Sequence, residues 1–404
     1  MFPKLRFKEF DENWKEVTLK NCITSIDSGW SPQCESYPAN SSEWGVLKTT
    51  SVDWSGFNSS FNKKLPLELT PRKEIEVKPL DILVTRAGPT ERVGVVSVVP
   101  HSVRSKLMIS DKLIRLKSNE ENNPLFLGIS LSSVKCQNQL QSKTSGLAKS
   151  QTNISQKILG EVLLKLPSKE EQTKIASFLS AVDEKISQLT KKHELLSQYK
   201  QGMMQKLFSQ QLRFKADDGS EFGEWEDKKL GEISKTFSGG TPQSSNKSFY
   251  EGTIPFIKSG EISKNTTEQC INDLALEKSS AKLVKKGDLL YALYGATSGQ
   301  VAISQIDGAI NQAVLCIRSD LNTKYLLNFL LLKKAEILTT YLQGGQGNLS
   351  ASILKEIYIP TPCLQEQTKI ANFLSSIDQK IEVVAQQIEQ AKTWKKGLLQ
   401  QMFV

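Results

Sequence analysis

The sequence predicts an α+β chain built from two similar halves. Each half is a β-rich domain followed by one long helix, and the two helices pair as an antiparallel coiled coil. Three observations lead to this prediction. A segment near residue 170 returns almost unchanged 195 positions later. Both copies carry apolar residues at alternating steps of four and three, the pattern of a coiled-coil helix. The stretches between them contain short apolar runs bounded by Gly, Pro and Asn, which are typical of strands.

Length and composition limit what the chain can be. Its 404 residues predict two or three domains at roughly 150 residues per domain. With 38% hydrophobic residues it can form ordinary cores, and its formal net charge of +9 permits a polyanionic partner without requiring one. No run approaches the roughly 18 apolar residues of a membrane span, and the start MFPKLRFKEF lacks the apolar region of a secretory signal. We therefore expect a cytoplasmic protein without a membrane association.

Cysteine and histidine provide little material for a metal site. The two histidines, His101 and His193, are too few for a His-based metal site or catalytic triad, and the cysteines form no C-x-x-C pair. We expect reduced, buried thiols at all six positions. The cysteines are Cys22, Cys34, Cys136, Cys270, Cys316 and Cys363.

The β-rich domains are expected at residues 1–166 and 211–361. Predicted strands lie at 81–85, 93–99, 113–116, 288–294 and 313–318, and short helices at 123–136 and 322–340. A weaker repeat relates the domains: residues 14–19 resemble 225–230, 28–32 resemble 238–242, and 80–83 resemble 287–290, in the same order. This order indicates a duplicated domain.

The repeated segments at 167–210 and 362–404 are predicted to be long helices. About 40 residues at 1.5 Å each give roughly 60 Å per helix. Pro167 and Pro362 end the preceding strands, and Glu171 or Glu366 places negative charge in the first turn, where it suits the helix dipole. About four to five heptads in both copies favour a coiled coil over the alternative, a single amphipathic core helix.

The pairing is predicted to be antiparallel because a whole domain separates the helices and the repeat is circular. Residues 212–214 follow the first copy, and the same Leu-Arg-Phe opens the chain at 5–7. Polar seam residues such as Lys200 and Lys395 are expected to fix the register. The apolar seam positions, predicted to form the helix–helix or subunit interface, are Ile175, Leu179, Val182, Ile186, Leu189, Leu196, Met203, Ile370, Leu374, Ile377, Ile381, Val384, Ile388 and Leu398.

The sequence shows no catalytic motif. It has no phosphate-binding P-loop, no G-x-S-x-G elbow and no paired-His metal motif, and the glycines at 344–347 lack the strand-then-helix context of a nucleotide fold. Asp111-Lys112 is interpreted as a surface pair. We therefore expect no catalytic residue, no metal and no cofactor in this chain.

Three pairs of loops suit the recognition of polar edges. They lie at 48–51 and 258–261, at 85–88 and 294–297, and at 146–153 and 344–348. Their cations, amides and hydroxyls can donate to phosphates and read base edges, although such loops are equally typical of solvated turns. The candidate DNA-binding residues are Lys48, Thr49, Arg86, Lys149, Gln151, Thr241, Lys258, Tyr294, Thr297, Asn311, Gln346 and Asn348.

The arrangement resembles the specificity (S) subunit of type I restriction-modification systems. The run from Pro362 to Ala371 resembles that family's P-x-x-x-E-Q-x-x-I-A helix entry, and Pro167 to Ala176 is the other copy. Residues 225–233 and 238–242 look like its domain opening, and 287–290 with Asn311-Gln312 like its later strands. The first domain departs from this pattern at Trp30-Ser31, Pro79-Leu80 and Ser110-Asp111.

The resemblance implies a non-catalytic subunit with two target-recognition domains. Each domain would bind one half of a split double-stranded DNA target. The helices would set the spacer and dock two modification (methyltransferase) subunits, with restriction (nuclease/translocase) subunits in the full complex. S-adenosylmethionine, ATP and Mg would belong to those partners. Two alternatives remain: a coiled-coil scaffold with two protein- or peptide-binding domains, and a self-sufficient methyltransferase or nuclease, for which the sequence offers no cofactor site.

Overall fold

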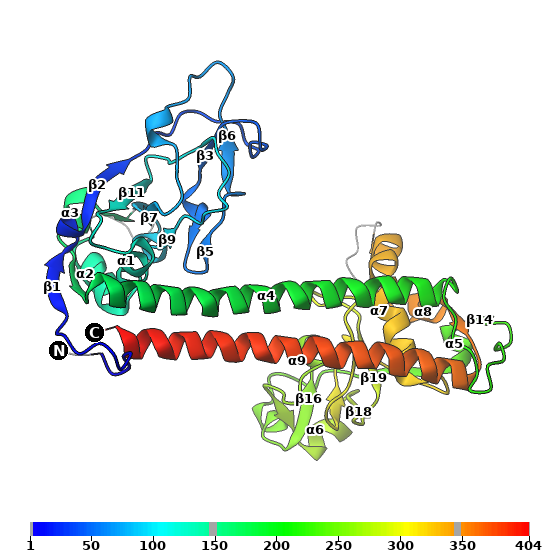
Figure 1. Cartoon of the computed structure of the whole chain (residues 1–404). Coiled ribbons are helices and arrows are strands. Elements are labelled where there is room, and N and C mark those ends of the chain that lie inside the picture. Colours follow the sequence, from blue (N-terminus) through cyan, green and yellow to red (C-terminus); the bar gives the residue numbers. More distant parts are fainter. Residues whose placement is uncertain (1–2, 145–151, 343–348, 404) are drawn as a thin grey trace. The chain divides into compact units, whose positions relative to one another are not determined.

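The computed structural model describes residues 3–144, 152–342 and 349–403 (Figure 1). It confirms the α+β class, and the chain divides into two compact units. Unit 1 comprises Met1–Gln188 and Ile388–Val404, and unit 2 comprises Leu189–Gln387. Each unit therefore holds one β-rich domain and a part of both long helices. Within the described ranges, no helix is both long and apolar enough to cross a membrane.

Unit 1 is built around a four-stranded antiparallel sheet in the order β2-β11-β7-β9. A second sheet has the order β10-β3-β6, and β1 pairs with β13 next to the long helices. Its strands are β1 Lys15–Thr18, β2 Ile23–Ser28, β3 Gly45–Leu47, β4 Val52–Asp53, β5 Gly56–Phe57, β6 Asn62–Lys64, β7 Ile82–Thr85, β8 Ala87–Gly88, β9 Val96–Val98, β10 Leu107–Met108, β11 Leu113–Ser118, β12 Thr152–Asn153 and β13 Leu163–Leu166. Its short helices are α1 Pro124–Leu131, α2 Val134–Ser142 and α3 Gln156–Gly160.

Unit 2 repeats this plan. Its central sheet has the order β15-β22-β19-β20, its second sheet β17-β16-β21-β18, and β14 pairs with β23. The strands are β14 Glu226–Lys229, β15 Ser234–Ser238, β16 Ile254–Ile257, β17 Cys270–Ile271, β18 Lys282–Val284, β19 Leu289–Ala292, β20 Val301–Ile303, β21 Gly308–Ile310, β22 Val314–Ser319 and β23 Tyr358–Thr361. The short helices are α5 Leu230–Ile233, α6 Asp273–Glu277 and α8 Ala351–Lys355, and a longer helix is α7 Thr323–Leu342. The matching order of strands shows the duplication that the weak repeat predicts.

The two repeated segments form α4, Lys169–Phe208, and α9, Leu364–Met402, of 40 and 39 residues. In unit 1 the start of α4 packs on the end of α9, and in unit 2 the end of α4 packs on the start of α9. The helix segments are therefore antiparallel within each unit, as predicted. The seam residues listed above are buried or half-buried, and Met204 joins them in the core.

Polar seam residues pair with carboxylates on the facing helix. Lys200 Nζ lies 2.7 Å from Asp378 in unit 2, and Lys395 Nζ lies 2.5 Å from Asp183 in unit 1. A lysine on the seam can form an ion pair only when the alignment of the two helices places a carboxylate beside it. These pairs therefore favour one register of the helices over its neighbours.

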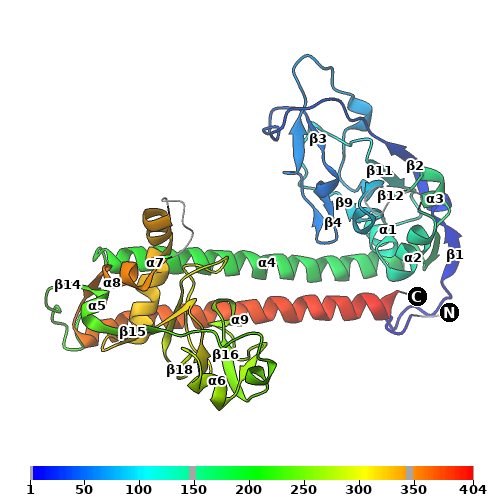
Figure 2. The ribbon, with the colours of Figure 1, turned by 180° about the vertical axis from the view of Figure 1, so that it is seen from behind.

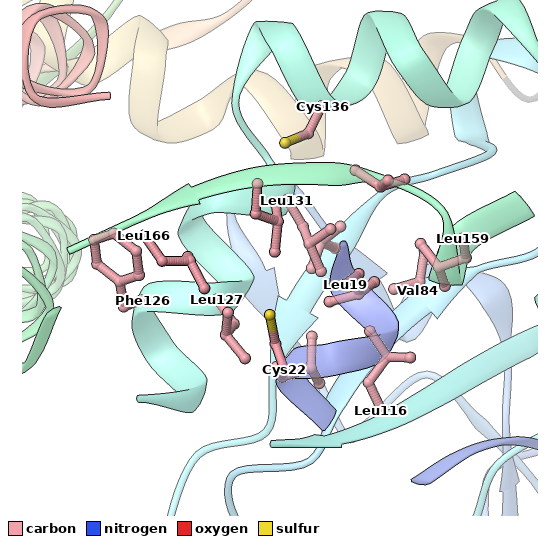
Figure 3. Packing of buried hydrophobic residues seen from close by; sticks show 14 of the residues in the cluster. Leu19, Cys22, Val84, Leu116, Phe126, Leu127, Leu131, Cys136, Leu159 and Leu166 are labelled. Carbon is pink, nitrogen blue, oxygen red and sulfur yellow. The ribbon is translucent and has the colours of Figure 1, made fainter. Parts of the chain in front are cut away.

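The core of unit 1 continues from the sheet into the long helices. Leu116 and Leu19 pack with Leu127 and Leu131 of α1 (Figure 3). The same cluster includes Phe126 and the first apolar seam residues of α4, and Figures 1 and 2 show α1 and α2 beside the start of that helix. The domain and the helix thus share one core, so the domain is anchored to the helix by buried apolar surface.

Two predictions need correction. The single helix expected at 123–136 is two helices, because Asn123 caps α1 and the Ser133 side chain starts a new helix by accepting from Cys136 N–H. The six cysteines are free, as expected. Cys22, Cys136 and Cys316 are buried as predicted, but Cys34 and Cys270 are only half-buried and Cys363 is exposed. It lies directly before α9, where the chain enters the helix from a strand and the side chain faces solvent.

Candidate nucleic-acid interface

Three loops of unit 2 meet at one end of its central sheet. The turn between β21 and β22 is held from two sides: Gly239 N–H donates to the Asn311 carbonyl at 3.2 Å, and the Tyr294 hydroxyl donates to the Gln312 carbonyl at 2.6 Å. The Thr241 hydroxyl donates to Gln312 Oε1 at 2.6 Å. Three predicted site residues, Thr241, Tyr294 and Asn311, therefore lie together, although they come from three separate parts of the sequence.

Lys258 and Thr297 come together in the same unit. Lys258 precedes the 3-10 turn Ser259–Glu261, and a Cβ on Gly260 of this turn would lie 4.0 Å from Thr297 Cγ2. The buried Glu261 carboxylate holds the turn in place by accepting from the Lys258 N–H at 3.1 Å and from the Glu268 N–H at 2.8 Å. The turn is thus fixed while the Lys258 side chain stays half-exposed.

Unit 1 closes its loops with equivalent hydrogen bonds. Gly29 N–H donates to the Ser110 carbonyl at 3.2 Å, and Arg86 N–H donates to the Lys112 carbonyl at 2.8 Å. The Ser31 hydroxyl donates to Asp111 Oδ1. Arg86 is thereby placed beside the turn that precedes β11, as Tyr294 is placed beside the turn that precedes β22.

The backbone pairing corrects one alignment drawn from the sequence. Thr85 N–H donates to the Val95 carbonyl at 2.9 Å, and Ala292 N–H donates to the Gln300 carbonyl at 2.8 Å. These bonds show that Thr85 occupies the position in unit 1 that Ala292, not Tyr294, occupies in unit 2. The loop pair at 85–88 and 294–297 was therefore displaced by two residues, because short Gly-containing stretches align equally well in neighbouring registers.

Lys48 and Thr49 join the same group of loops through a residue that sequence reasoning missed. The guanidinium of Arg92 donates to the carbonyls of Thr49 and Val52, at 3.3 and 2.7 Å, and to the Asp53 carboxylate at 2.6 Å. A hydrogen bond from Ser55 N–H, followed by the one from Arg92, holds the pKa of Asp53 below its usual range. Arg92 is thus committed to structure, and Lys48 remains the half-exposed cation of this turn.

The remaining predicted residues, Lys149, Gln151, Gln346 and Asn348, lie outside the described residues. The neighbouring Thr152 is described, and its hydroxyl lies 2.7 Å from that of Thr90. Strand β12, which contains Thr152, pairs with β8 in the 85–92 loop. The described end of the third loop of unit 1 therefore adjoins the 85–92 loop.

Sequence reasoning also missed Ser31, Asp111 and Gln312. Asp111 was interpreted as an ordinary surface residue, and Gln312 was noted only as part of a strand motif. The repeat itself held the signal, because Ser31 aligns with Thr241 and Asp111 with Gln312 at constant local offsets. All four side chains are exposed.

The equivalent aspartates directly before β7 and β19, Asp81 and Asp288, have pKa values shifted in opposite directions. Burial alone would raise the pKa of Asp288, but hydrogen bonds from Arg318 and from the Lys285 N–H outweigh it and hold the pKa below its usual range. In unit 1, burial of Asp81 raises its pKa despite the nearby Arg115 guanidinium. Arg115 forms its bidentate hydrogen bonds with Asp27, whereas Arg318 forms its bidentate hydrogen bonds with Asp288.

The Glu-Gln pair that opens each long helix is buried and bonded. Glu366 is fully buried and accepts from Arg213 Nε and Nη2 at 3.0 and 2.8 Å and from Trp225 Nε1 at 2.8 Å. In unit 1, Glu171 accepts from Arg6 at 2.7 Å twice and from Trp14 Nε1 at 3.3 Å. The acid in the first turn therefore anchors the domain to its helix, a role that the helix-dipole argument does not include.

The glutamine of the pair ties the helix to the domain's own helix. Gln367 Nε2 donates to the Pro362 carbonyl at 2.8 Å, and its Oε1 accepts from the Asn322 N–H, at the start of α7, at 2.8 Å. Gln172 makes the same two bonds, to Pro167 at 3.1 Å and from Asn123 at 3.0 Å. Each domain is thus fixed to the helix entry by an identical set of side chains.

The circular repeat has a direct structural counterpart. Leu212 N–H donates to the Lys206 carbonyl at 3.1 Å, where the chain leaves α4. Leu5 N–H donates to the Gln401 carbonyl at 3.0 Å, in the equivalent place at the end of α9. The beginning of the chain therefore lies against its end within unit 1.

The described residues contain no cluster of three or more His, Cys, Asp or Glu side chains suited to a metal ion. What the two loop groups offer is a set of hydroxyls, amides and cations on exposed turns. Such groups bind by hydrogen bonding and charge, at phosphates and at the edges of bases.

Comparison with known proteins identifies a matching family. The model described as "Type I restriction modification DNA specificity domain" matches residues 12–197 and 223–393. The putative type I restriction enzyme MjaX specificity subunit of Methanocaldococcus jannaschii is 27% identical over 98% of this chain and 94% of its own length. The type I restriction enzyme EcoEI specificity subunit of Escherichia coli is 40% identical, over 42% of this chain and 29% of its own length.

A solved structure shares the fold over the whole chain. The type I restriction-modification S subunit from M. genitalium matches with a TM-score of 0.63 and 18% identity, covering 100% of this chain and 99% of that one. A chain from a structure of type I restriction-modification complex assembly matches with a TM-score of 0.58 and 18% identity, covering 97% of both.

Proposed function

The chain belongs to the type I restriction-modification DNA specificity family, and on this basis we propose that its two domains each read one half of a split double-stranded DNA target. Recognition of a DNA sequence is the function of this family. The observation that supports a divided target is the repeated loop group: both units bring equivalent turns to the same end of their central sheets. We assign Lys48, Arg86, Lys258 and Tyr294, with their neighbours in these turns, to the DNA-facing surfaces.

The long helices are proposed to dock two modification subunits and to set the spacer between the half-sites. One face of α4 and α9 forms the seam, but Leu195, Tyr199, Val383 and Trp394 on the other faces are exposed. Large apolar side chains that stay exposed on a helix are typical of surfaces that bind another protein. Restriction subunits would be present in the full complex.

The chemistry is proposed to reside in those partners. The described parts of the loop groups supply hydrogen-bond donors and acceptors on exposed turns. We therefore assign S-adenosylmethionine, ATP and Mg to the partner subunits and no catalytic role to this chain. Because its proposed target is double-stranded DNA, the chain is proposed to work in the cytoplasm.

Methylation mapping tests this proposal. The chain is co-expressed with its modification subunit, and methylated bases in the host genome are located by long-read sequencing. We expect one bipartite motif with an unread spacer, and none when the modification subunit is expressed alone. A genome without a sequence-specific motif would contradict the proposal, as would S-adenosylmethionine binding by the isolated chain in calorimetry.

Salt dependence supplies a second test. Contacts with phosphates release counterions, so the logarithm of the affinity of the purified complex for DNA should fall linearly with the logarithm of salt concentration. Each phosphate contact contributes a slope of about −0.9. Lys258→Met should reduce the slope by about one. An affinity that does not depend on salt would speak against the assignment of these loops to DNA.

A further inference from the structure

One exposed position differs in chemistry between two otherwise equivalent loop groups. The turn before β11 in unit 1 carries Asp111, and the equivalent turn before β22 in unit 2 carries Gln312. Both are exposed and both accept a hydrogen bond from a hydroxyl on the loop that follows the first strand. The geometry is repeated, whereas the hydrogen-bonding groups that face outwards are different.

The partner loops are fixed by glycine at one position. A Cβ on Gly239 would lie 1.7 Å from the Ile310 carbonyl oxygen, and a Cβ on Gly29 would lie 1.7 Å from that of Ile109. Only glycine permits this close approach of two backbones. The loop carrying Ser31 or Thr241 is therefore held against the turn that carries the differing side chain.

In unit 2 this arrangement orients an amide. Thr241 occupies one lone pair of Gln312 Oε1 at 2.6 Å, which leaves the second lone pair and the Nε2 hydrogens. Among the described residues, no group bonds to Nε2. An amide with a free acceptor and a free donor matches the N6 and N7 edge of adenine in the major groove.

In unit 1 the same arrangement orients a carboxylate. Ser31 bonds to Asp111 Oδ1, and no described residue bonds to Oδ2. The only acceptors it presents match an exocyclic amino group, and carboxylates typically accept from cytosine N4. Because phosphates repel a carboxylate, an exposed Asp among cationic loops lowers affinity for DNA unless a base donates to it.

We propose that Asp111 and Gln312 are the paired specificity-determining residues of the two domains, Asp111 accepting from a cytosine amino group and Gln312 making a bidentate contact with adenine. Ser31 and Thr241 act as positioning residues that fix the orientation of these side chains. This inference rests on the proposed function, because it presumes that the loop groups face DNA. It adds which side chains distinguish the two half-sites and which bases they select.

The test exchanges one atom at each position. Gln312→Glu keeps the acceptor for Thr241 and replaces the amide donor by an acceptor, and Asp111→Asn makes the converse change. Each variant is co-expressed with the modification subunit, and its methylation motif is mapped beside the wild-type motif. Glu120→Gln and Asp320→Asn serve as controls, since both residues are exposed and follow the opposite ends of β11 and β22.

The expected result is a change confined to one base pair of one half-site. Gln312→Glu should lose its preference for adenine by roughly 5- to 150-fold, the range of a bidentate base contact. The half-site of unit 1 should stay unchanged, and Asp111→Asn should show the reverse. The inference is overturned if both variants methylate the wild-type motif, or if a variant changes the half-site of the other unit.

A loss of all methylation is resolved by binding. The purified complex is titrated with duplexes in which one base pair of the wild-type site is changed at a time. Loss of discrimination at a single position supports the inference, and an equal loss of affinity for every duplex overturns it. The proposed function fails by a different observation, a wild-type complex without any bipartite motif.

Discussion

Replacement of Arg213 by methionine should destabilise unit 2 strongly. Arg213 gives two hydrogen bonds to Glu366, which is fully buried at the entry of α9. Methionine keeps an apolar stem but removes the guanidinium, whose central carbon lies 5.8 Å from the centroid of the Trp225 ring. The carboxylate then stays buried with Trp225 Nε1 as its remaining side-chain donor. A buried charge without its partner is among the costliest defects in a folded protein.

The structure sets the size of the effect. Removal of one member of a buried pair costs about 3–5 kcal/mol, and the Arg213 side chain is 19% exposed. Water can therefore reach the vacated position, which places the loss at the lower end, about 3 kcal/mol. For a unit of about 200 residues, 1 kcal/mol shifts the Tm by about 2–4 °C. We expect the melting transition of unit 2 to fall by about 6–12 °C.

The assay compares this variant with one that breaks an exposed pair. Lys333→Met removes the Lys333–Glu336 bridge, whose side chains are 37% and 66% exposed. Such a pair on one helix contributes about 0.3–0.5 kcal/mol, so the Tm should move by about 2 °C or less. Thermal unfolding followed by circular dichroism gives both values, and hydrogen exchange at the start of α9 assigns the loss to unit 2.

A double variant isolates the cause. When Glu366→Gln is added to Arg213→Met, the stranded charge is gone, and part of the lost stability should return. An equal Tm shift for Arg213→Met and Lys333→Met would refute the reasoning. So would a double variant whose loss is the sum of the two single losses, because the two groups would then act independently.

Four further predictions concern other parts of the fold. The pKa of Asp288 is lowered in the folded state, so its stabilisation is present above its ordinary value of 3.8 and disappears as the pH falls through the folded value. Urea unfolding between pH 3 and 6 should therefore show a smaller loss of stability with acid in Asp288→Asn than in the wild type; equal slopes would contradict this. Gly239→Ala should cost about 1–3 kcal/mol in urea unfolding, because its Cβ meets a backbone oxygen. Gly202→Ala, in α4 with nothing within 4 Å of its Cβ, should instead stabilise by about 0.5–1 kcal/mol, and a loss there would show that the helix needs the glycine. Insertion of one heptad into each of α4 and α9 should lengthen the spacer of the methylation motif and leave its half-sites unchanged; altered half-sites with the old spacer would refute the role of the helices as a ruler.

The sequence predicts best what depends on a regular period. The seam of α4 and α9 repeats over many turns, so each residue adds evidence to the same element, and the ends agree with the structure to within a few residues. The break between α1 and α2 depends on a single cap, Ser133, within a stretch that looks uniformly helical. One residue is a weak signal against the propensity of its neighbours.

Contacts between distant residues could not be predicted. Glu171 and Arg6 are 165 positions apart, and Glu366 and Arg213 are 153 apart. No local sequence pattern predicts such a pair. From the sequence, the presence of these glutamates in the first turn could be explained only by the helix dipole. Gln312 was missed for the same reason, since its meaning comes from Thr241, which the fold brings within 2.6 Å. The internal repeat supplied the list of matching positions but not the contacts among them.

The two halves of this chain differ at the ends of the loops that we assign to DNA, and they agree where each domain meets its long helix. The side chains that fix each domain, Glu and Gln at the helix entry with Arg and Trp in the domain, are the same in both units. The residues at the loop ends differ: Asp111 in unit 1 corresponds to Gln312 in unit 2, and Trp30 corresponds to Gly240. Under the proposed function, the identical contacts give both units the same helix entry for binding modification subunits, whereas the different loop ends select different sequences. A single duplication accounts for both properties when docking keeps the helix entries alike and the loops diverge.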